Sequence, residues 1–420
     1  MDPVQAFGIR RGDIVAFVGA GGKTTAMFRL ADELTTRGLR VVTTTTTRLA
    51  REEAERAPER LVVELETGPP KSLPALLEKH RHIFVYTRPA ELDKVRGVSE
   101  AWLSESLKTS PGLDVVLIEA DGSRRLPLKA PYPHEPALPP SATLVVPSVG
   151  LNVLGQPLDD EHVYGAELIQ VWAGLPPGVP VSAELVASVL ANTGMGLKSI
   201  PEGARVVPLL NRVTAETLDE ARAIARRLLA EPRIARVVIG AMAEERPVWE
   251  VRRRVSGIIL AAGQSKRMGR PKLLLPWRGG KSIIRQVCEQ AAANDDLREV
   301  LVITGAHHES IGQQVADLPV RTIFNPRYAE GEMLSSLQTG LAALAEGQSD
   351  ACLVMLGDQP GIKPETIGSV LAAYAQGRGP IVAPAFRGQR GHPILIDRSF
   401  WETITALPPG SAPRDALRTH

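Results

Sequence analysis

The stretch 256-SGIILAAGQSKRMGRPKLLLPW-277 decides how the second half of the chain folds. Residues 255–262 form an apolar run rich in β-branched side chains, which predicts a buried strand. Gly263 follows the run, and glycine allows both a sharp turn and a close backbone approach to a ligand. Arg267 and Lys272 then supply positive charge for phosphate oxygens. The stretch therefore predicts an anion-binding loop after a strand, although a plain turn with solvated basic residues is the alternative.

Short β-branched runs alternate with helical periodicity along the whole chain. Met27, Leu30 and Leu34 have the spacing of an amphipathic helix within 23–34, and a second helix is expected at 282–293. This alternation predicts an α/β fold with two doubly wound, mostly parallel sheets, whose ligands lie beyond the carboxyl ends of the strands. Strands are expected at 13–18, 40–46, 82–86, 113–119, 143–147, 205–210 and 235–240, and then at 255–262, 299–305, 352–356, 380–385 and 393–396.

The composition is that of an ordinary globular protein of two or three domains. The chain has 420 residues, and its 49 basic and 47 acidic side chains nearly cancel, so charge gives no case for a nucleic acid or a membrane surface as partner. Two cysteines, Cys288 and Cys352, exclude a disulfide framework and indicate a reducing compartment. With no signal-like start and no apolar run of transmembrane length, we expect a cytoplasmic protein. The basic stretch 250-EVRRRV-255 predicts a boundary between domains at 1–250 and 255–420.

An acidic residue follows a second apolar run, in 353-LVMLGDQPG-361. Mg²⁺ prefers one or two carboxylates together with phosphates and waters, and Asp358 is placed to supply one of them at a strand end. Gly-Asp-Gln-Pro is also a common turn sequence, so a purely structural role is the alternative.

Taken in order, L-A-A-G-x-S-x-R-M-G, a Pro-Lys and G-D-Q-P resemble the nucleotidyltransferase family that includes the MocA-type molybdenum cofactor cytidylyltransferases. Further similarity lies in 325-NPRYAEGEMLSSLQTGL-341 and in 391-GHP-393. The resemblance implies a Rossmann-like domain in which Lys272 contacts phosphates, Asp358 binds Mg²⁺, and Ser335 and His392 contact the acceptor. It also implies a nucleotide-binding loop made of Leu260, Ala261, Ala262, Gly263, Ser265 and Arg267.

The same resemblance implies a reaction. A phosphate on molybdopterin attacks the α-phosphate of CTP in line, and pyrophosphate leaves; Arg267, Lys272 and the Asp358-bound Mg²⁺ offset the charge. The Leu-Ala-Ala-Gly form, with Ala262, resembles the cytidylyl branch rather than the guanylyl branch. The sequence departs from the family near its end, where Ser411 stands in place of an aspartate that would be a second metal ligand.

The stretch 17-FVGAGGKTT-25 joins an expected strand to an expected helix. Backbone amides at a helix N-terminus favour anions, a lysine there reaches phosphates, and a threonine hydroxyl can hold Mg²⁺. Phe17 stands where a complete P-loop has glycine, so we expect a P-loop-like rather than a standard site, and a tight turn is the alternative. The residues expected in this second nucleotide site are Gly19, Gly21, Gly22, Lys23, Thr24, Thr25 and Asp121.

Other features of the first half fit a nucleotide site. Glu119 and Asp121 end an apolar strand in 116-VLIEADGSRRLPLKAP-131, and a merely solvated position is the alternative for Arg124 and Lys129. Together with Gly-Lys-Thr-Thr and the threonine run in 42–49, this pattern resembles the YqeC-type family, which implies an accessory role for selenium-dependent molybdenum hydroxylases and an apo-hydroxylase as partner. The stretch 210-LNRVT-214 only half matches a guanine-reading sequence, so it does not indicate GTP.

The sequence leaves three functions open. The first is a CTP:molybdopterin cytidylyltransferase fused to an accessory domain for hydroxylase maturation. The second is a non-catalytic carrier of nucleotide and cofactor. The third is a nucleotidyltransferase with a sugar phosphate as acceptor. His134, His307 and His308 lack the spacing of metal ligands, so surface or structural roles are expected for them.

Overall fold

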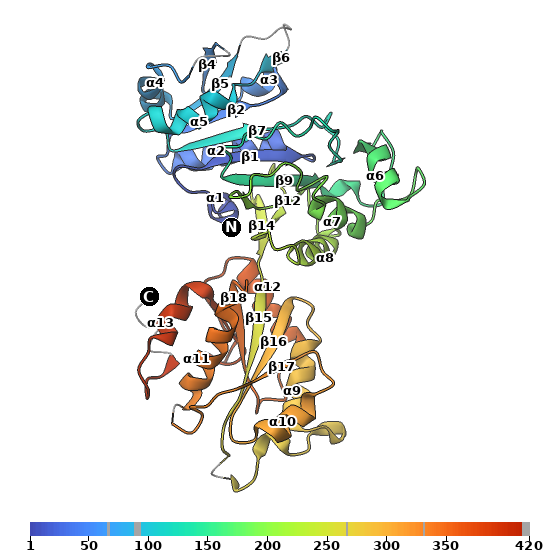
Figure 1. The fold of residues 1–420 in the computed structure, drawn as a ribbon, viewed down its shortest axis with the longest axis vertical. Helices are drawn as coiled ribbons and strands as arrows, with labels where there is room; N and C mark the ends of the chain where they lie inside the picture. Colours follow the sequence, from blue (N-terminus) through green and yellow to red (C-terminus); the bar gives the residue numbers. More distant parts are fainter. Residues whose placement is uncertain (65–67, 88–93, 266–267, 331, 414–420) are drawn as a thin grey trace. The chain divides into compact units, whose positions relative to one another are not determined.

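The chain forms two compact units, Met1–Arg252 and Arg253–His420, in a computed structural model (Figure 1). The structure describes residues 1–64, 68–87, 94–265, 268–330 and 332–413. Within these ranges, no helix is both long enough and apolar enough to cross a membrane.

The N-terminal unit is built on one large sheet, in the order β14-β13-β12-β9-β1-β7-β2-β5-β6-β3, with β11 beside β9 and β4 beside β5. The central strands are parallel, and antiparallel pairs are confined to its two ends. The strands are β1 (Ile14–Gly19), β2 (Val41–Thr45), β3 (Arg48–Ala50), β4 (Glu59–Val63), β5 (His82–Thr87), β6 (Lys94–Arg96), β7 (Val115–Glu119), β9 (Leu144–Gly150), β11 (Arg205–Val206), β12 (Leu209–Asn211), β13 (Val237–Gly240) and β14 (Val248–Arg252), and a separate pair is made by β8 (Leu128–Lys129) and β10 (Val163–Tyr164).

Both faces of this sheet are buried under helices. In β1, Ile14, Ala16 and Val18 join one core, and Val15 and Phe17 join the core on the opposite face. Helices α1 and α2 pack in the second core, and α4, α5, α7 and α8 pack in the first. The helices are α1 (Pro3–Phe7), α2 (Lys23–Thr36), α3 (Arg51–Ala54), α4 (Leu73–His80), α5 (Glu100–Thr109), α6 (Ala166–Ala173), α7 (Ala183–Ala191) and α8 (Leu218–Leu228).

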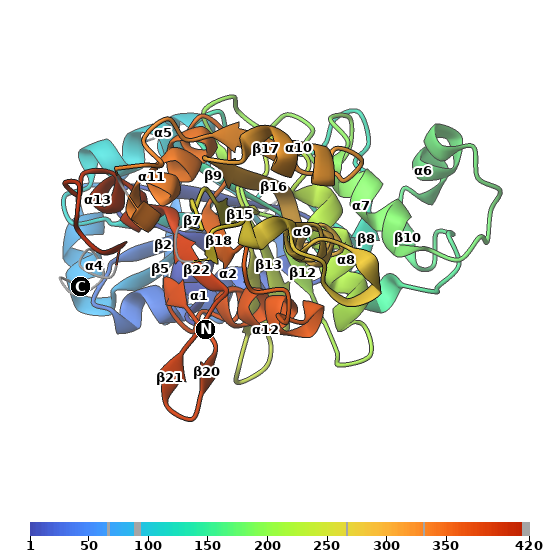
Figure 2. The same ribbon diagram turned by 90° about the horizontal axis from the view of Figure 1, so that it is seen from below.

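The C-terminal unit has a six-stranded sheet in the order β17-β16-β15-β18-β22-β19. Its first four strands are parallel, and β22 runs antiparallel to both of its neighbours. A small hairpin, β20–β21, stands out from this unit in Figure 2. The strands are β15 (Val255–Ala261), β16 (Leu297–Thr304), β17 (Arg321–Phe324), β18 (Ala351–Leu356), β19 (Ile381–Val382), β20 (Ala385–Phe386), β21 (Gln389–Arg390) and β22 (Ile394–Asp397).

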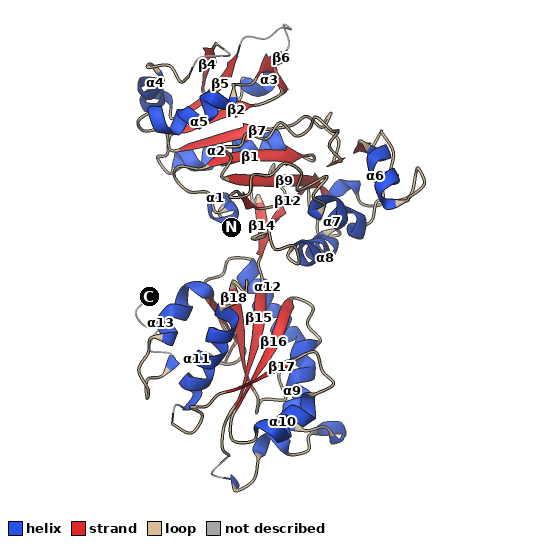
Figure 3. Ribbon diagram, in the orientation of Figure 1, coloured by secondary structure: helices blue, strands red, loops and turns tan. Residues whose placement is uncertain are grey.

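Helices lie on both sides of this second sheet too, as Figure 3 shows. Those on one side, α9, α10 and α12, share a core with Ile259 of β15, and α11 and α13 share the opposite core with Ile258. The expected α/β architecture with mostly parallel sheets is therefore confirmed. The helices are α9 (Ile283–Ala292), α10 (His308–Val315), α11 (Glu332–Ala345), α12 (Pro364–Ala375) and α13 (Trp401–Thr405).

Candidate functional site

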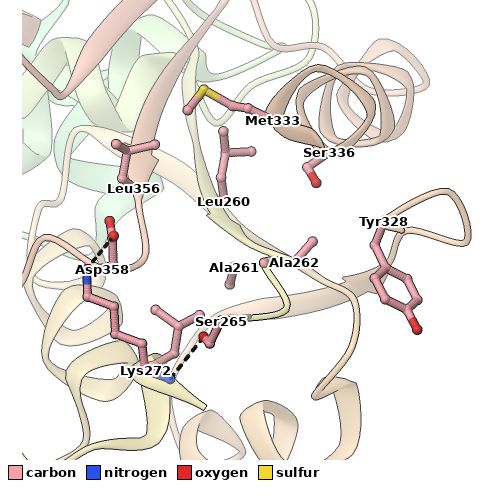
Figure 4. A pocket seen from close by; sticks show the side chains of 12 residues that line it. Leu260, Ala261, Ala262, Ser265, Lys272, Tyr328, Met333, Ser336, Leu356 and Asp358 are labelled. Carbon is pink, nitrogen blue, oxygen red and sulfur yellow. Dashed lines mark hydrogen bonds and ion pairs between the residues drawn. The ribbon is translucent and has the colours of Figure 1, made fainter. Parts of the chain in front are cut away.

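A cavity of about 390 Å³ opens at the carboxyl ends of β15 and β18 (Figure 4). This edge of a parallel sheet is where doubly wound folds bind their ligands. The cavity is lined by Leu260, Ala261, Ala262, Gly263, Ser265, Lys272, Leu273, Tyr328, Met333, Ser336, Leu356 and Asp358.

The loop after β15 forms one wall of the cavity. Ser265 has a left-handed backbone with φ of 52°, and its hydroxyl accepts a hydrogen bond of 3.0 Å from the backbone N–H of Lys272. The bond closes the loop over seven residues and brings Lys272 back towards the strand end. The five residues expected to bind nucleotide from Leu260 to Ser265 therefore line the same cavity as Lys272. Arg267 lies outside the described residues.

Lys272 and Asp358 both line the cavity and contact each other, although 86 residues separate them in the sequence. Lys272 Nζ donates to Asp358 Oδ2 at 2.8 Å, and both side chains are 42% exposed. A half-exposed ion pair of this kind stabilises a fold by only about 0–1 kcal/mol, so an incoming anion or cation can replace either partner at little cost. The arrangement presents a cation and a carboxylate to one ligand.

His392 lies near the same carboxylate. Burial lowers the pKa of His392, and the negative charge of Asp358 acts in the opposite direction. Burial is the larger effect, so the neutral imidazole is the form favoured near neutral pH.

Ser336 rather than Ser335 lines the cavity. Ser335 is 3% exposed, accepts a 2.9 Å hydrogen bond from Asn325 Nδ2, and donates to the carbonyl oxygen of Arg327. Consecutive positions on α11 point about 100° apart, and of the two serines it is Ser336 that lines the cavity. Ser335 is not among the residues that line the cavity, its assignment to the acceptor stays a prediction, and the buried Asn325 was not singled out from the sequence.

The cavity suits a metal ion that is coordinated mainly by a bound substrate and only in part by the protein. Asp358 offers one half-exposed carboxylate, and the described residues contain no cluster of three or more His, Cys, Asp or Glu able to enclose a metal. Mg²⁺ is commonly bound in this way, by one or two carboxylates together with substrate phosphates and water.

The residues expected in the second nucleotide site also come together, around the turn between β1 and α2. Gly19, Gly21 and Gly22 all have positive φ, and a Cβ at Gly21 would lie 2.0 Å from the backbone nitrogen of Gly150. Lys23 begins α2 and lies 3.0 Å from Asp121 Oδ1. Thr24 donates from Oγ1 to Glu119 Oε2 at 2.6 Å, and Thr25 follows in the first turn of α2.

Two further residues, Lys129 and Asn211, belong to the contacts around this turn. Lys129, for which a solvated position was the alternative, is 4% exposed and forms ion pairs with Asp121 and Glu135. Asn211, from the half match to a guanine-reading sequence, instead supports the turn: its Nδ2 donates to the carbonyl oxygen of Gly21 at 2.8 Å, and its Oδ1 accepts from Met242 N–H. Neither burial could be read from the sequence, because both depend on distant segments.

Comparisons with known proteins match each unit separately. The model of the YqeC protein family matches residues 15–167, and the model of the MobA-like NTP transferase domain matches residues 257–420. The uncharacterized protein YqeC of Escherichia coli (strain K12) is 33% identical over 204 residues, covering 48% of this chain and 77% of that protein.

The names of two further relatives state an activity. The nicotine blue oxidoreductase of Paenarthrobacter nicotinovorans is 31% identical over 166 residues, 38% of this chain and 78% of that protein. The molybdenum cofactor cytidylyltransferase of Escherichia coli (strain K12) is 28% identical over 142 residues, which cover 34% of this chain and 69% of that protein. Among solved structures, a nucleotidyl transferase from Methanothermobacter thermautotroptrophicus is 24% identical with a TM-score of 0.32, covering 40% of this chain and 81% of that one.

Family models match on both sides of the boundary at Arg252, and the chain spans more than two thirds of its YqeC relative. The chain therefore belongs to the YqeC family through its N-terminal unit and to the MobA-like NTP transferase family through its C-terminal unit.

Proposed function

We propose that the C-terminal unit transfers CMP from CTP to the phosphate of molybdopterin, with release of pyrophosphate. The observation that carries this proposal is the meeting of Lys272 and Asp358 in the cavity at the end of β15. Membership of the MobA-like NTP transferase family supports nucleotidyl transfer, and the cytidylyltransferase relative supports the choice of substrates. We further propose that the YqeC unit serves maturation of a molybdenum hydroxylase.

The reaction forms one phosphorus–oxygen bond and breaks another. An oxygen of the acceptor phosphate attacks the α-phosphorus of CTP, and the bond from that phosphorus to the bridging oxygen of pyrophosphate breaks. Lys272 is placed to neutralise charge on the phosphates, and the Leu260–Ser265 loop holds the nucleotide against the strand end. Asp358 would hold Mg²⁺, which supplies further neutralisation of the triphosphate when bound. His392, whose pKa burial lowers, would contact the acceptor as a neutral side chain.

The test is pyrophosphate release from a panel of nucleoside triphosphates with purified molybdopterin, with products identified by mass spectrometry. We expect CTP to be preferred and Lys272→Ala and Asp358→Asn each to lower kcat/KM by about a hundredfold, since each removes charge compensation from the transition state. Lys281→Ala is the matched control, because Lys281 is a similarly exposed lysine that pairs with Glu289 on α9, and it should retain activity. Equal release by the wild type and Asp358→Asn would remove Asp358 from the mechanism.

A non-catalytic carrier is a second candidate, supported by Ser411 in place of the family's second acidic position. It predicts tight binding of molybdopterin and no product with any nucleotide, so multiple turnover would exclude it. A sugar phosphate acceptor is distinguished from molybdopterin by an acceptor screen with CTP in the same assay.

An oxidoreductase is a third candidate, because identity to the nicotine blue oxidoreductase is 31% against 28% for the cytidylyltransferase. It predicts consumption of NADH or NADPH in the presence of nicotine blue. The Lys272–Asp358 pair favours nucleotidyl transfer over hydride transfer. In hydride transfer the nicotinamide cofactor carries the chemistry, and no carboxylate is needed beside a lysine that contacts phosphates.

A further inference from the structure

Buried charged side chains gather where β1 and β7 end, in the unit that the proposed transfer reaction does not use. Asp121 lies between two lysines: Lys23 Nζ is 3.0 Å from its Oδ1, and Lys129 Nζ is 3.2 Å from its Oδ2. The exposed fractions of Lys23, Asp121 and Lys129 are 3%, 2% and 4%. Buried ion pairs recover their desolvation cost only in part, so stability alone is a weak reason for such a cluster.

Glu119 adds a further carboxylate beside these pairs. It is 8% exposed, accepts the hydrogen bond from Thr24, and forms no ion pair with any lysine or arginine in the described parts of the chain. Burial raises the pKa of Glu119, and the charge of Lys23 and the hydrogen bond from Thr24 oppose that shift. A carboxylate and a hydroxyl held together at the end of a strand are oxygen ligands of the kind that Mg²⁺ takes beside a phosphate chain.

Helix α2 begins at this cluster with its backbone donors uncapped. Its N-cap is Gly22, and no described side chain caps its first turn. The first amides of a helix have no acceptor within the helix and lie at the positive end of its dipole, which favours an anion. A Cβ at Gly22 would lie 2.6 Å from Asn211 Nδ2, so the side chain of Asn211 packs closely against the turn that leads into α2.

Asp121 and Lys23 are not fully satisfied by each other. Asp121 Oδ1 is buried and accepts no hydrogen bond from a described residue. Lys23 Nζ instead donates to the carbonyl oxygen of Gly19 at 2.6 Å and to Ser123 Oγ at 3.4 Å. Asp121 Oδ2 accepts from the backbone N–H of Gly19 at 2.9 Å and lies beside Lys129. Asp121 therefore keeps a cation and a donor when Lys23 turns to another partner.

We propose that the N-terminal unit binds the phosphate chain of a nucleoside triphosphate together with a divalent cation. The first-turn amides of α2 and the ammonium of Lys23 take the phosphate oxygens. Thr24 and Glu119 take the cation. Lys129 is a positioning residue: it neutralises Asp121 when Lys23 exchanges that carboxylate for the ligand. This site is separate from the cavity beside Asp358 and does not depend on the transfer reaction.

The test is isothermal titration of the full chain carrying Lys272→Ala and Asp358→Asn, which weaken binding in the other unit. MgATP, MgGTP, MgCTP and magnesium tripolyphosphate are titrated in separate runs. We expect one site for at least one nucleoside triphosphate, and we expect Lys23→Met to weaken it at least about tenfold, as loss of a charge-assisted hydrogen bond does. Lys198→Met is the control, because Lys198 donates to the carbonyl oxygens of Tyr132 and Pro133 in the same unit, outside the cluster.

Thr24→Val and Lys129→Met extend the test. Thr24→Val should lower the affinity for the nucleoside triphosphate in the presence of Mg²⁺. It should leave the weaker binding of the same nucleotide without Mg²⁺ unchanged. Lys129→Met should also weaken binding, because Asp121 then holds Lys23 more tightly; retained affinity would remove Lys129 from the proposal. Circular dichroism establishes that each variant is folded, and if Lys23→Met is not, Thr24→Val decides.

Absence of triphosphate binding, or equal binding by Lys23→Met, overturns the proposal. Tripolyphosphate that binds as tightly as every nucleotide would overturn the nucleoside part of it.

Discussion

Lys23 and Lys272 place the same functional group in opposite surroundings. The Lys272–Asp358 pair is half exposed, whereas the Lys23–Asp121 pair is almost completely buried. Removing Lys272 should therefore change activity with little effect on stability, because exposed pairs contribute about 0–1 kcal/mol. Removing Lys23 takes away one of the two cations that pair with the buried carboxylate of Asp121. Loss of the only partner of a buried charge lowers the free energy of unfolding by several kcal/mol. Lys129 limits that cost here.

Single residues mark the limit of what the sequence could predict about the sites. Lys272 and Asp358 could be placed together because each follows a strand, and neighbouring parallel strands end at one edge of a sheet. Lys129 could not be placed, because its burial depends on Asp121 and Glu135 and on the ring of Tyr164, whose centroid is 4.6 Å from Nζ. Ser335 was expected at the acceptor through the family resemblance alone, and a single sequence cannot show that its neighbour Ser336 lines the cavity instead.

His82 is expected to make the N-terminal unit sensitive to acid. Burial lowers its pKa from 6.5 to about 4, and its Nε2 lies 2.9 Å from Thr43 Oγ1. The unfolded chain binds the proton more readily than the folded unit does, so the free energy of unfolding falls as pH drops from about 6.5 to about 4 and levels off below that. The full shift corresponds to about 3 kcal/mol.

Hydrogen exchange of β5 between pH 7 and pH 4 measures this loss of stability, after correction for the intrinsic exchange rate. His82→Gln should remove most of the dependence. His162→Gln, at a partly exposed histidine paired with Asp159, should retain it. A profile for His82→Gln that matches the wild type would assign the acid sensitivity to other groups.

At the scale of elements, strands that are continuous apolar runs were the predictable ones. β15 and β18 are buried along nearly their whole length and read as continuous apolar runs, so both were expected within about two residues. β4 and β17 were missed because they are partly exposed and carry charged or polar residues. The expected strand at 205–210 is divided into β11 and β12 around Pro208, which has no backbone N–H to donate to a ladder.

A buried amide, that of Asn325, ties the connection after β17 to α11. Asn325 donates from Nδ2 to Ser335 and Ser336 at 2.9 and 3.2 Å, and its Oδ1 accepts from Arg327 N–H at 3.0 Å. Asn325→Ala removes the donor to both serines and the acceptor of the Arg327 N–H, and the loss of these buried hydrogen bonds costs about 1–3 kcal/mol. Because Ser336 and Tyr328 line the cavity, we expect KM for the acceptor to rise more than kcat falls.

Urea denaturation and steady-state kinetics together measure both effects of Asn325→Ala. Asn294→Ala is the matched control, since Asn294 makes the same side-chain hydrogen bond to a backbone N–H two residues on, away from the cavity. If the two variants behave alike, Asn325 has no special part in shaping the site.

At the scale of the whole molecule, the two units have separate interiors. Four hydrophobic cores are described, two within Met1–Arg252 and two within Arg253–His420, and each draws its residues from one unit alone. A domain that owns its hydrophobic core can in principle fold alone. The sequence indicated a boundary between two domains, because the strand expected at 255–262 begins a second series of alternating strands and helices. Such a second series is expected to form a sheet of its own.

Residues 253–420, produced alone, should therefore unfold cooperatively in calorimetry and release pyrophosphate with kcat/KM within about twofold of the full chain, as expected where distant parts act independently. A fragment of residues 271–420 is the control. It lacks β15, which pairs with both β16 and β18, so it should show no cooperative transition. If residues 253–420 fold but lose more than about tenfold in kcat/KM, the YqeC unit contributes to catalysis. Joining the units in one chain would then serve the reaction itself rather than only bring two activities together.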